Sequence, residues 1–101
     1  MVKHVILWTL KEEHNTPAVK ERMKTALEGL AGQIPGLVDI RVVIHGLPTS
    51  NADVMLDATF TDEAALAAYA IHPLHVEAAD TCVRPFTATR SCLDFAVFSG
   101  E

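Results

Sequence analysis

The sequence predicts an α+β domain whose elements follow the order strand, helix, strand, strand, helix, strand. Two observations support this order: four segments alternate their residues with the period of two that strands show, and two intervening segments have helical spacing or an alanine-rich, capped composition. A chain of 101 residues is long enough for one hydrophobic core and too short for two. We therefore expect residues 1–101 to form a single domain.

The first strand is expected in "VKHVILWTL", where both alternating sets of residues include large apolar side chains. The helix that follows has Thr16 as its N-cap, Pro17 as its first residue, and apolar residues three and four positions apart. We expect this helix to end near Gly32. Pro35 and Gly36 then form the turn into the next strand.

The second and third strands are expected in "LVDIRVVIH" and "VMLDATF", on either side of the turn-forming stretch "GLPTSNAD". Thr61 or Asp62 then caps the alanine-rich helix "EAALAAYAI". Pro73 ends that helix, because proline disfavours the helical conformation of the residue before it, and opens another helix in "PLHVEAADTCV". "TATRSCLDFAVF" is the closing strand.

This order is the split βαβ arrangement of a ferredoxin-like fold, with an antiparallel sheet and helices on one face. The helix-free face needs a cover, since the first and last strands carry large apolar residues on both faces. Hydrophobic residues make up 50% of the chain and its mean hydropathy is +0.23, both high for a small monomer. A homodimer that closes two sheets into a dimeric α/β barrel is the simplest solution.

Charge and composition exclude several partners. The net charge of -5, without a run of lysines or arginines, argues against binding to nucleic acid or to an anionic membrane. The apolar run at the N-terminus is far shorter than the roughly 20 residues that span a bilayer, so we expect a cytoplasmic protein. Cys82 and Cys92 lie outside any CxxC pattern, which favours free, buried thiols over a disulfide or a zinc site.

The stretch "YAIHPLH" holds the candidates for chemistry, because its proline break would let Tyr69 and His75 converge. His75 falls at the third position of the helix opened by Pro73, where the helix dipole favours a neutral imidazole that can act as a base. Tyr69 could then donate its hydroxyl to a developing oxyanion. The alternative is purely structural: these residues, and His72 above all, satisfy polar groups freed at the helix junction.

We expect any pocket between the sheet and the helices. His4 shares a strand face with two predicted wall residues, and Asp94 is the best candidate to orient His4 or His75 through a ring nitrogen. A plain hydrophobic core is the alternative. The histidines show no ligand spacing, so no side-chain metal site is expected. The predicted wall consists of Ile6, Trp8, Met23, Leu27, Leu56, Ile71 and Ala78.

Over nearly its whole length the chain resembles the stress-responsive dimeric α/β barrel (Dabb) family. The resemblance lies in "VKHVILWTL", "IPGLVDI", "ATFTDEAALAAYAIHPLH" and "LDFAV". It implies ferredoxin-like subunits that pair sheet to sheet. One branch of the family resembles polyketide cyclases of the olivetolic acid type, which use no cofactor and close a ring by an intramolecular aldol step. In that branch the acid/base pair corresponds to Tyr69 and His75, and the histidine corresponding to His4 lies in the pocket.

The chain departs from the cyclase branch in the wall of the pocket. Met23 and Leu27 stand where that branch has aromatic residues, and Ala78 and Ala79 stand where it has phenylalanine and glycine. Some relatives also look able to hold a hard cation with main-chain carbonyls, at positions that correspond to Ala31, Ile34 and Leu37. A retained acid/base pair with a changed wall argues for a different substrate, or for none.

Three functions follow from these residues and from the resemblance. The first is a cyclase-like lyase that performs acid/base chemistry on a polyketide-like carbonyl compound without a cofactor. The second is a non-catalytic protein that binds a small molecule or protects against stress. The third, which rests only on analogy of fold, is a cofactor-free monooxygenase or a haem-handling protein.

Overall fold

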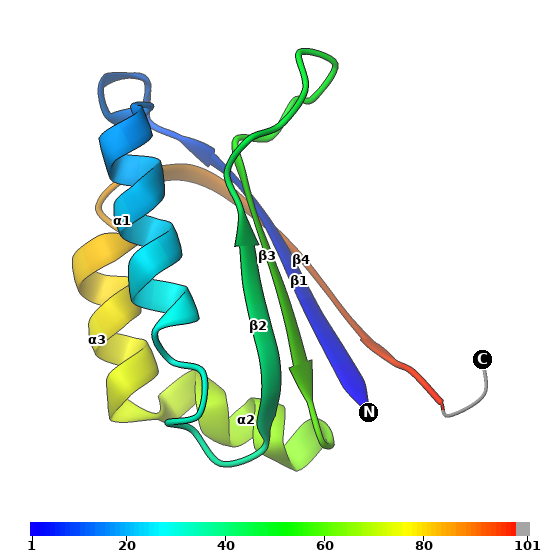
Figure 1. Ribbon diagram of the computed structural model, residues 1–101. Helices are drawn as coiled ribbons and strands as arrows, with labels where there is room; N and C mark the ends of the chain where they lie inside the picture. The colour runs from blue at the N-terminus through cyan, green and yellow to red at the C-terminus, as the bar shows by residue number, and fades with distance from the viewer. Residues whose placement is uncertain (99–101) are drawn as a thin grey trace.

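The computed structural model describes residues 1–98 and confirms the ferredoxin-like α+β fold. Four strands form one antiparallel sheet in the order β2-β3-β1-β4, and three α-helices lie on one of its faces (Figure 1). A short 3-10 turn, Glu12–His14, precedes α1. The elements are β1 (Val2–Leu10), α1 (Pro17–Glu28), β2 (Leu37–Val43), β3 (Val54–Phe60), α2 (Glu63–Ile71), α3 (Pro73–Cys82) and β4 (Thr87–Ala96).

Three predicted elements extended at least two residues beyond their observed ends. Helix α1 ends at Glu28 instead of near Gly32, and the chain continues through turns in which Gly32 takes a φ of 77°. Strand β2 ends at Val43, which pairs with Met55 near the start of β3, and the chain leaves the sheet after that pair. Strand β4 ends at Ala96, which pairs with Val2, the first residue of β1. Beyond that pair Val97 still donates to the Met1 carbonyl, but it is no longer part of the strand.

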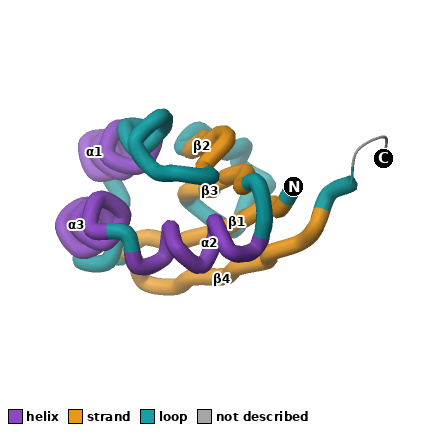
Figure 2. Tube along the Cα trace, turned by 90° about the horizontal axis from the view of Figure 1, so that it is seen from below, coloured by secondary structure: helices purple, strands orange, loops and turns teal. Residues whose placement is uncertain are grey.

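The core fills the space between the sheet and the helices. Along β1 and β3 the buried residues alternate with less buried ones, so each strand turns one side chain in two toward the helices. Helices α1 and α3 lie side by side, α1 packs over β2, and α2 crosses the end of the sheet (Figures 1 and 2). The largest side chains that are fully buried are Tyr69, Phe60, Met23 and Leu56.

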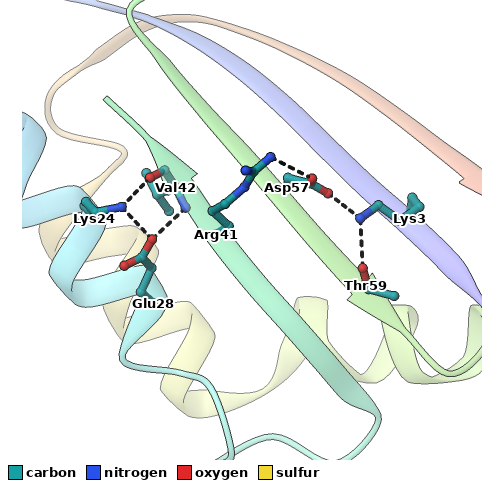
Figure 3. A network of polar contacts seen from close by, with 7 residues as sticks. All are labelled: Lys3, Lys24, Glu28, Arg41, Val42, Asp57 and Thr59. Atoms are coloured by element: carbon teal, nitrogen blue, oxygen red, sulfur yellow. Dashed lines mark hydrogen bonds and ion pairs between the residues drawn. The ribbon is translucent and has the colours of Figure 1, made fainter. Parts of the chain in front are cut away.

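Helix α1 is fastened to the outer edge of β2 by two charged side chains (Figure 3). The Lys24 ammonium donates to the Val42 carbonyl at 2.6 Å and to Glu28 at 2.8 Å, and Glu28 accepts from the Val42 amide at 2.9 Å. The hydrogen bond from Lys24, followed by that from Val42, lowers the pKa of Glu28. Backbone groups that would be free on an edge strand are thereby satisfied within the chain.

The predicted helix signals are confirmed at three ends. Thr16 accepts a hydrogen bond from the Val19 amide, and Asp62, not Thr61, caps α2. His72 caps α3 through Nδ1, which accepts from the Leu74 amide at 3.1 Å. The structural role expected of His72 at the junction is therefore what the structure shows.

Within residues 1–98, no helix covers the other face of the sheet. An ion-paired strip runs across its centre, where Lys3 lies 2.6 Å from Asp57 and Arg41 lies 3.5 Å from the same carboxylate (Figure 3). Beside this strip Leu7 and Phe95 are 44% and 42% exposed, although both are large and apolar. This face is therefore a mixed surface with an apolar part and a fixed charge pattern.

The prediction of two buried cysteines was wrong. Cys82 is half-buried and Cys92 is exposed, because Cys92 lies on β4, an edge strand that is mostly exposed on both faces. Both are free thiols. Among the described residues, no helix has the length and apolar character required to cross a membrane.

Candidate functional site

A cavity of about 380 Å³ lies on the helical face of the sheet, between β1 and β4 on one side and α2 and α3 on the other. Its volume is within the range of small-molecule pockets in proteins, roughly 300–1,000 Å³. Apolar side chains from β1, from α2 and from the end of α3 make up much of its wall. Its polar residues are His4, Tyr69, His75, Arg84, Thr87, Arg90, Cys92 and Asp94.

Tyr69, near the end of α2, lines this cavity and is only 1% exposed. Its ring packs edge-on against Phe60, with the ring centroids 4.9 Å apart. The hydroxyl has no hydrogen-bond partner among residues 1–98. Burial raises the pKa of Tyr69 to about 12, so the hydroxyl stays protonated and can only donate or accept as a neutral group. A buried hydroxyl without a partner is costly.

His75 is the third residue of α3, as predicted, and its ring centroid lies 4.1 Å from that of Tyr69. Its Nδ1 lies 3.2 Å from the Ala70 carbonyl, which can only accept, so Nδ1 carries the proton and Nε2 has the free lone pair. Burial lowers the pKa of His75, and the positive charge of Arg84 lowers it further, although the bond to Ala70 acts in the opposite sense. His75 is therefore a neutral base near pH 7.

His4 and Asp94 form a second polar pair in the cavity. They stand directly opposite each other on β1 and β4, and the Nδ1 of His4 contacts the Asp94 carboxylate. The structure thus places Asp94 on His4 and not on His75. The His4 ring is 7% exposed, and its centroid lies 6.2 Å from that of Tyr69. Tyr69 consequently lies near two imidazoles.

Cys92 lies beside this pair on the same face of β4. Its sulfur is 3.5 Å from the Asp94 carboxylate and 3.7 Å from the Nδ1 of His4. Burial, and then the charge of Asp94, raise the pKa of the Cys92 thiol. The three side chains make a compact cluster of nitrogen, sulfur and oxygen donors.

The structure brings only part of the predicted pocket to the cavity. Six of the predicted residues line it: His4, Ile6, Trp8, Tyr69, His75 and Asp94. The other five do not line this cavity. They are Met23, Leu27, Leu56, Ile71 and Ala78.

The packing of the helices and strands explains why each of these five residues lies outside the cavity. Met23 and Leu27 point from α1 into the core over β2, away from the cavity, and Leu56 is buried on β3. Ala78 lies on the side of α3 that meets α1. Ile71 ends α2 and is 80% exposed, because α2 is a short helix whose buried side is occupied by Tyr69.

Several residues that line the cavity were not predicted from the sequence. Arg90, Cys92 and Asp94 are two residues apart along β4 and lie on the same face of the strand. The period of two that placed Asp94 on this face therefore also predicts Arg90 and Cys92 there. Arg84 follows α3 and pairs with Asp80 one turn earlier. No pattern in the sequence indicates its place at the cavity, which depends on how α3 meets β4.

Comparison with known proteins agrees with this architecture. The family model described as "Stress responsive A/B Barrel Domain" matches residues 2–97. A dimeric ferredoxin-like protein of unknown function from Thermobifida fusca is 30% identical, with a TM-score of 0.84 over 95% of this chain and 90% of that chain. A dimeric protein of unknown function from Bacteroides fragilis is 27% identical, with a TM-score of 0.86 over 95% of both chains.

A more distant structure shares the fold alone. The hydroxynitrile lyase of Passiflora edulis is 13% identical and has a TM-score of 0.81 over 99% of this chain and 95% of that chain. No functionally curated protein matches the chain.

Proposed function

Because the chain belongs to the stress-responsive A/B barrel domain family, we propose that its cavity performs acid/base chemistry on a carbonyl compound without a cofactor. Aldol-type ring closure of a polyketide-like chain is the reaction that the residues fit best. The observation that carries the proposal is the pairing of a neutral His75 with a buried Tyr69 hydroxyl that has no partner among residues 1–98.

His75 supplies the base. An aldol step begins when a proton is removed from the carbon beside a carbonyl, and the free lone pair on Nε2 can accept it. The hydrogen bond from Nδ1 to the Ala70 carbonyl fixes this tautomer, and it also supports the imidazolium that forms when Nε2 is protonated. The lowered pKa keeps the base neutral below the usual pH of histidine titration.

Tyr69 supplies the donor. Its hydroxyl remains protonated because burial raises its pKa to about 12, so it can donate to the oxygen on which negative charge develops. In the free protein the group bears the cost of a missing partner. A substrate oxygen would provide that partner, so binding and charge stabilisation would both gain from the same hydroxyl.

The other polar groups assist through charge and position. Arg84 and Arg90 add positive charge to the lining of the cavity, which favours an enolate over a neutral ketone. His4, held by Asp94, is a second imidazole near Tyr69. Ile6 and Trp8 provide an apolar wall along which a carbon chain could fold.

The proposal is tested by the conversion of a linear poly-β-ketone and by deuterium exchange at its activated carbons. Proton transfer by a positioned side chain contributes on the order of 10²–10⁴ in rate, so His75→Ala is expected to lose at least a hundredfold in both assays. His72→Asn is the matched control, since it removes the neighbouring imidazole but retains a side chain that can cap α3. Equal rates for the wild type and His75→Ala would refute the proposal.

The alternative is a protein that binds a small molecule without converting it, and the cavity itself supports this reading. Native mass spectrometry distinguishes the two. A small molecule that is retained by the purified protein and lost in Ala67→Trp, which would fill the cavity, favours binding. If the same protein shows no turnover or exchange with any poly-β-ketone, the alternative replaces the enzyme.

We also propose that two copies of the chain pair through the helix-free face of the sheet. Neighbours of 27–30% identity are described as dimeric. The exposed apolar residues Leu7, Leu93 and Phe95 belong to β1 and β4, and their burial would remove an apolar surface that a small monomer rarely leaves open. Sedimentation equilibrium is expected to give the mass of two chains. The cytoplasmic location stays a prediction.

A further inference from the structure

We propose that His4, Cys92 and Asp94 form a binding site for a thiophilic divalent cation such as Zn²⁺. The three residues line the cavity next to Tyr69, and each turns one ligand atom toward the others. The reaction proposed for the cavity does not require this ion, so the two proposals stand separately. The site was not foreseen from the sequence, because its ligands lie 88 and 90 residues apart along the chain.

The distances between the donor atoms match tetrahedral coordination at two of the three edges. Bonds of about 2.3 Å to sulfur and about 2.0–2.2 Å to nitrogen or oxygen place sulfur roughly 3.6 Å from each of the other ligand atoms in a tetrahedral zinc site. The Cys92 sulfur lies 3.7 Å from the Nδ1 of His4 and 3.5 Å from the Asp94 carboxylate. The sulfur is thus already placed for a cation that all three residues share.

The third distance, between Nδ1 of His4 and the Asp94 carboxylate, has to lengthen before a cation can bind. Nδ1 of His4 and the Asp94 oxygen are in direct hydrogen-bond contact, closer than the roughly 3.3 Å that two such ligands of one zinc ion need. The Asp94 side chain is 45% exposed, so it can turn away by the small amount required. Neutral His4 then binds the cation through Nδ1 and carries its proton on Nε2, while the thiol of Cys92 releases its proton as the cation binds.

The sheet holds the ligands in place before any ion binds. Cys92 and Asp94 are two residues apart on one face of β4, and His4 stands opposite Asp94 on β1. Ligands on paired strands are positioned more accurately than ligands on loops. The three residues line the cavity. Three protein ligands and one open position are typical of zinc sites that also bind water or a small ligand.

The ligand types select the class of cation. A thiolate, an imidazole and a carboxylate in a compact site favour Zn²⁺ or Co²⁺, whereas Mg²⁺ and Ca²⁺ prefer oxygen ligands alone. Cobalt is the useful probe because it replaces zinc and reports on its ligands by its absorption spectrum. A thiolate ligand gives a strong charge-transfer band in the near ultraviolet.

Titration of the intact protein with Co²⁺ under reducing conditions tests the proposal. The wild type is expected to develop the thiolate band with one equivalent of Co²⁺ per chain and to lose it when Zn²⁺ is added. Cys92→Ser should abolish the band, and Asp94→Asn should weaken Co²⁺ binding at least tenfold. Mg²⁺ should not compete.

Cys82→Ser is the matched control, because Cys82 is the other free thiol of the chain and lies outside the cavity. This variant, and His75→Ala, should keep the full band, so a failure of the proposed reaction leaves the test of the metal site intact. Circular dichroism establishes that each variant is folded, and Cys92→Ala serves if Cys92→Ser is not. A wild type without the band, or a Cys92 variant that keeps it, overturns the proposal.

Discussion

Replacing Tyr69 with phenylalanine is expected to make the protein more stable, although the residue is among the most deeply buried in the chain. The Tyr69 hydroxyl is buried without a partner among residues 1–98, and its ring contacts Phe60 and His75. Tyr69→Phe removes the unpaired group and leaves the ring in place. The fold should therefore gain the free energy that the unsatisfied hydroxyl costs.

The size of the gain follows from the cost of burying a polar group. An unsatisfied buried donor or acceptor costs about 1–3 kcal/mol, and we expect a gain of about 1–2 kcal/mol at pH 7 after the loss of some packing around the oxygen. Because the slope of unfolding in urea is about 1–3 kcal/mol per molar for a small protein, the urea midpoint should rise by roughly 0.3–2 M.

The difference in the free energy of unfolding between Tyr69→Phe and the wild type should become larger at alkaline pH. Burial raises the pKa of Tyr69 from 10.0 to about 12, so its titration leaves the free energy of unfolding unchanged below pH 10 and lowers it as the pH rises from 10 toward 12. At pH 11 the wild type should have lost about 1.4 kcal/mol relative to Tyr69→Phe. Other titrating groups are common to both proteins and cancel in the comparison.

Urea unfolding followed by circular dichroism, at one protein concentration, measures the gain in stability at pH 7 and the larger difference at pH 11. Tyr69→Leu is the control for packing, because it removes the ring as well as the hydroxyl and should destabilise the fold. If Tyr69→Phe is no more stable than the wild type at pH 7, the hydroxyl has a partner, and the description of an unsatisfied donor in the cavity is wrong.

Two further predictions concern the turn before β2 and the helix-free face. Gly36→Ala should destabilise the fold by about 3 kcal/mol or more, because Gly36 has a φ of 82° and an added Cβ would lie 2.4 Å from the Cβ of Ala65. Gly32 has a φ of 77°, but an added Cβ would meet nothing within 4 Å. Gly32→Ala should therefore cost only about 1–2 kcal/mol, and thermal or urea unfolding measures both changes. Leu93→Lys should convert the dimer to single chains in sedimentation, whereas Leu47→Lys, also at an exposed leucine but in a loop, should not; a dimeric Leu93→Lys protein would contradict the proposed interface.

Local patterns predicted the fold because the elements of this chain are strongly marked. The alternation in β1 and β3 is the burial pattern that the structure shows, and Pro17 and Pro73 open the helices as expected. Boundaries were less accurate where pairing decides them. Strand β4 ends at Ala96 because β1 begins opposite it, and no property of the residues beyond Ala96 indicates that end.

The candidate site was predicted in part for the same physical reason. His4, Ile6 and Trp8 reach the cavity because a period of two fixes their common face, and His75 reaches it because Pro73 fixes the start of α3. No local pattern indicates which apolar residues of α1 and α2 reach the cavity. Met23 is buried in the core and Ile71 is exposed, yet both looked suitable for a wall.

The sequence by itself determined the order of the elements, the facing of the strand residues and the break that separates Tyr69 from His75, because each depends on interactions within a few residues. Only the tertiary structure decided what those residues meet. It brought Asp94 and Cys92 to His4 across some 90 positions of sequence, and it left the Tyr69 hydroxyl beside a cavity without a partner among residues 1–98. The pairing of β1 with β4 and the packing of α2 and α3 fix these contacts. Neither arrangement can be predicted from a local sequence pattern, because each joins residues that are far apart in the chain.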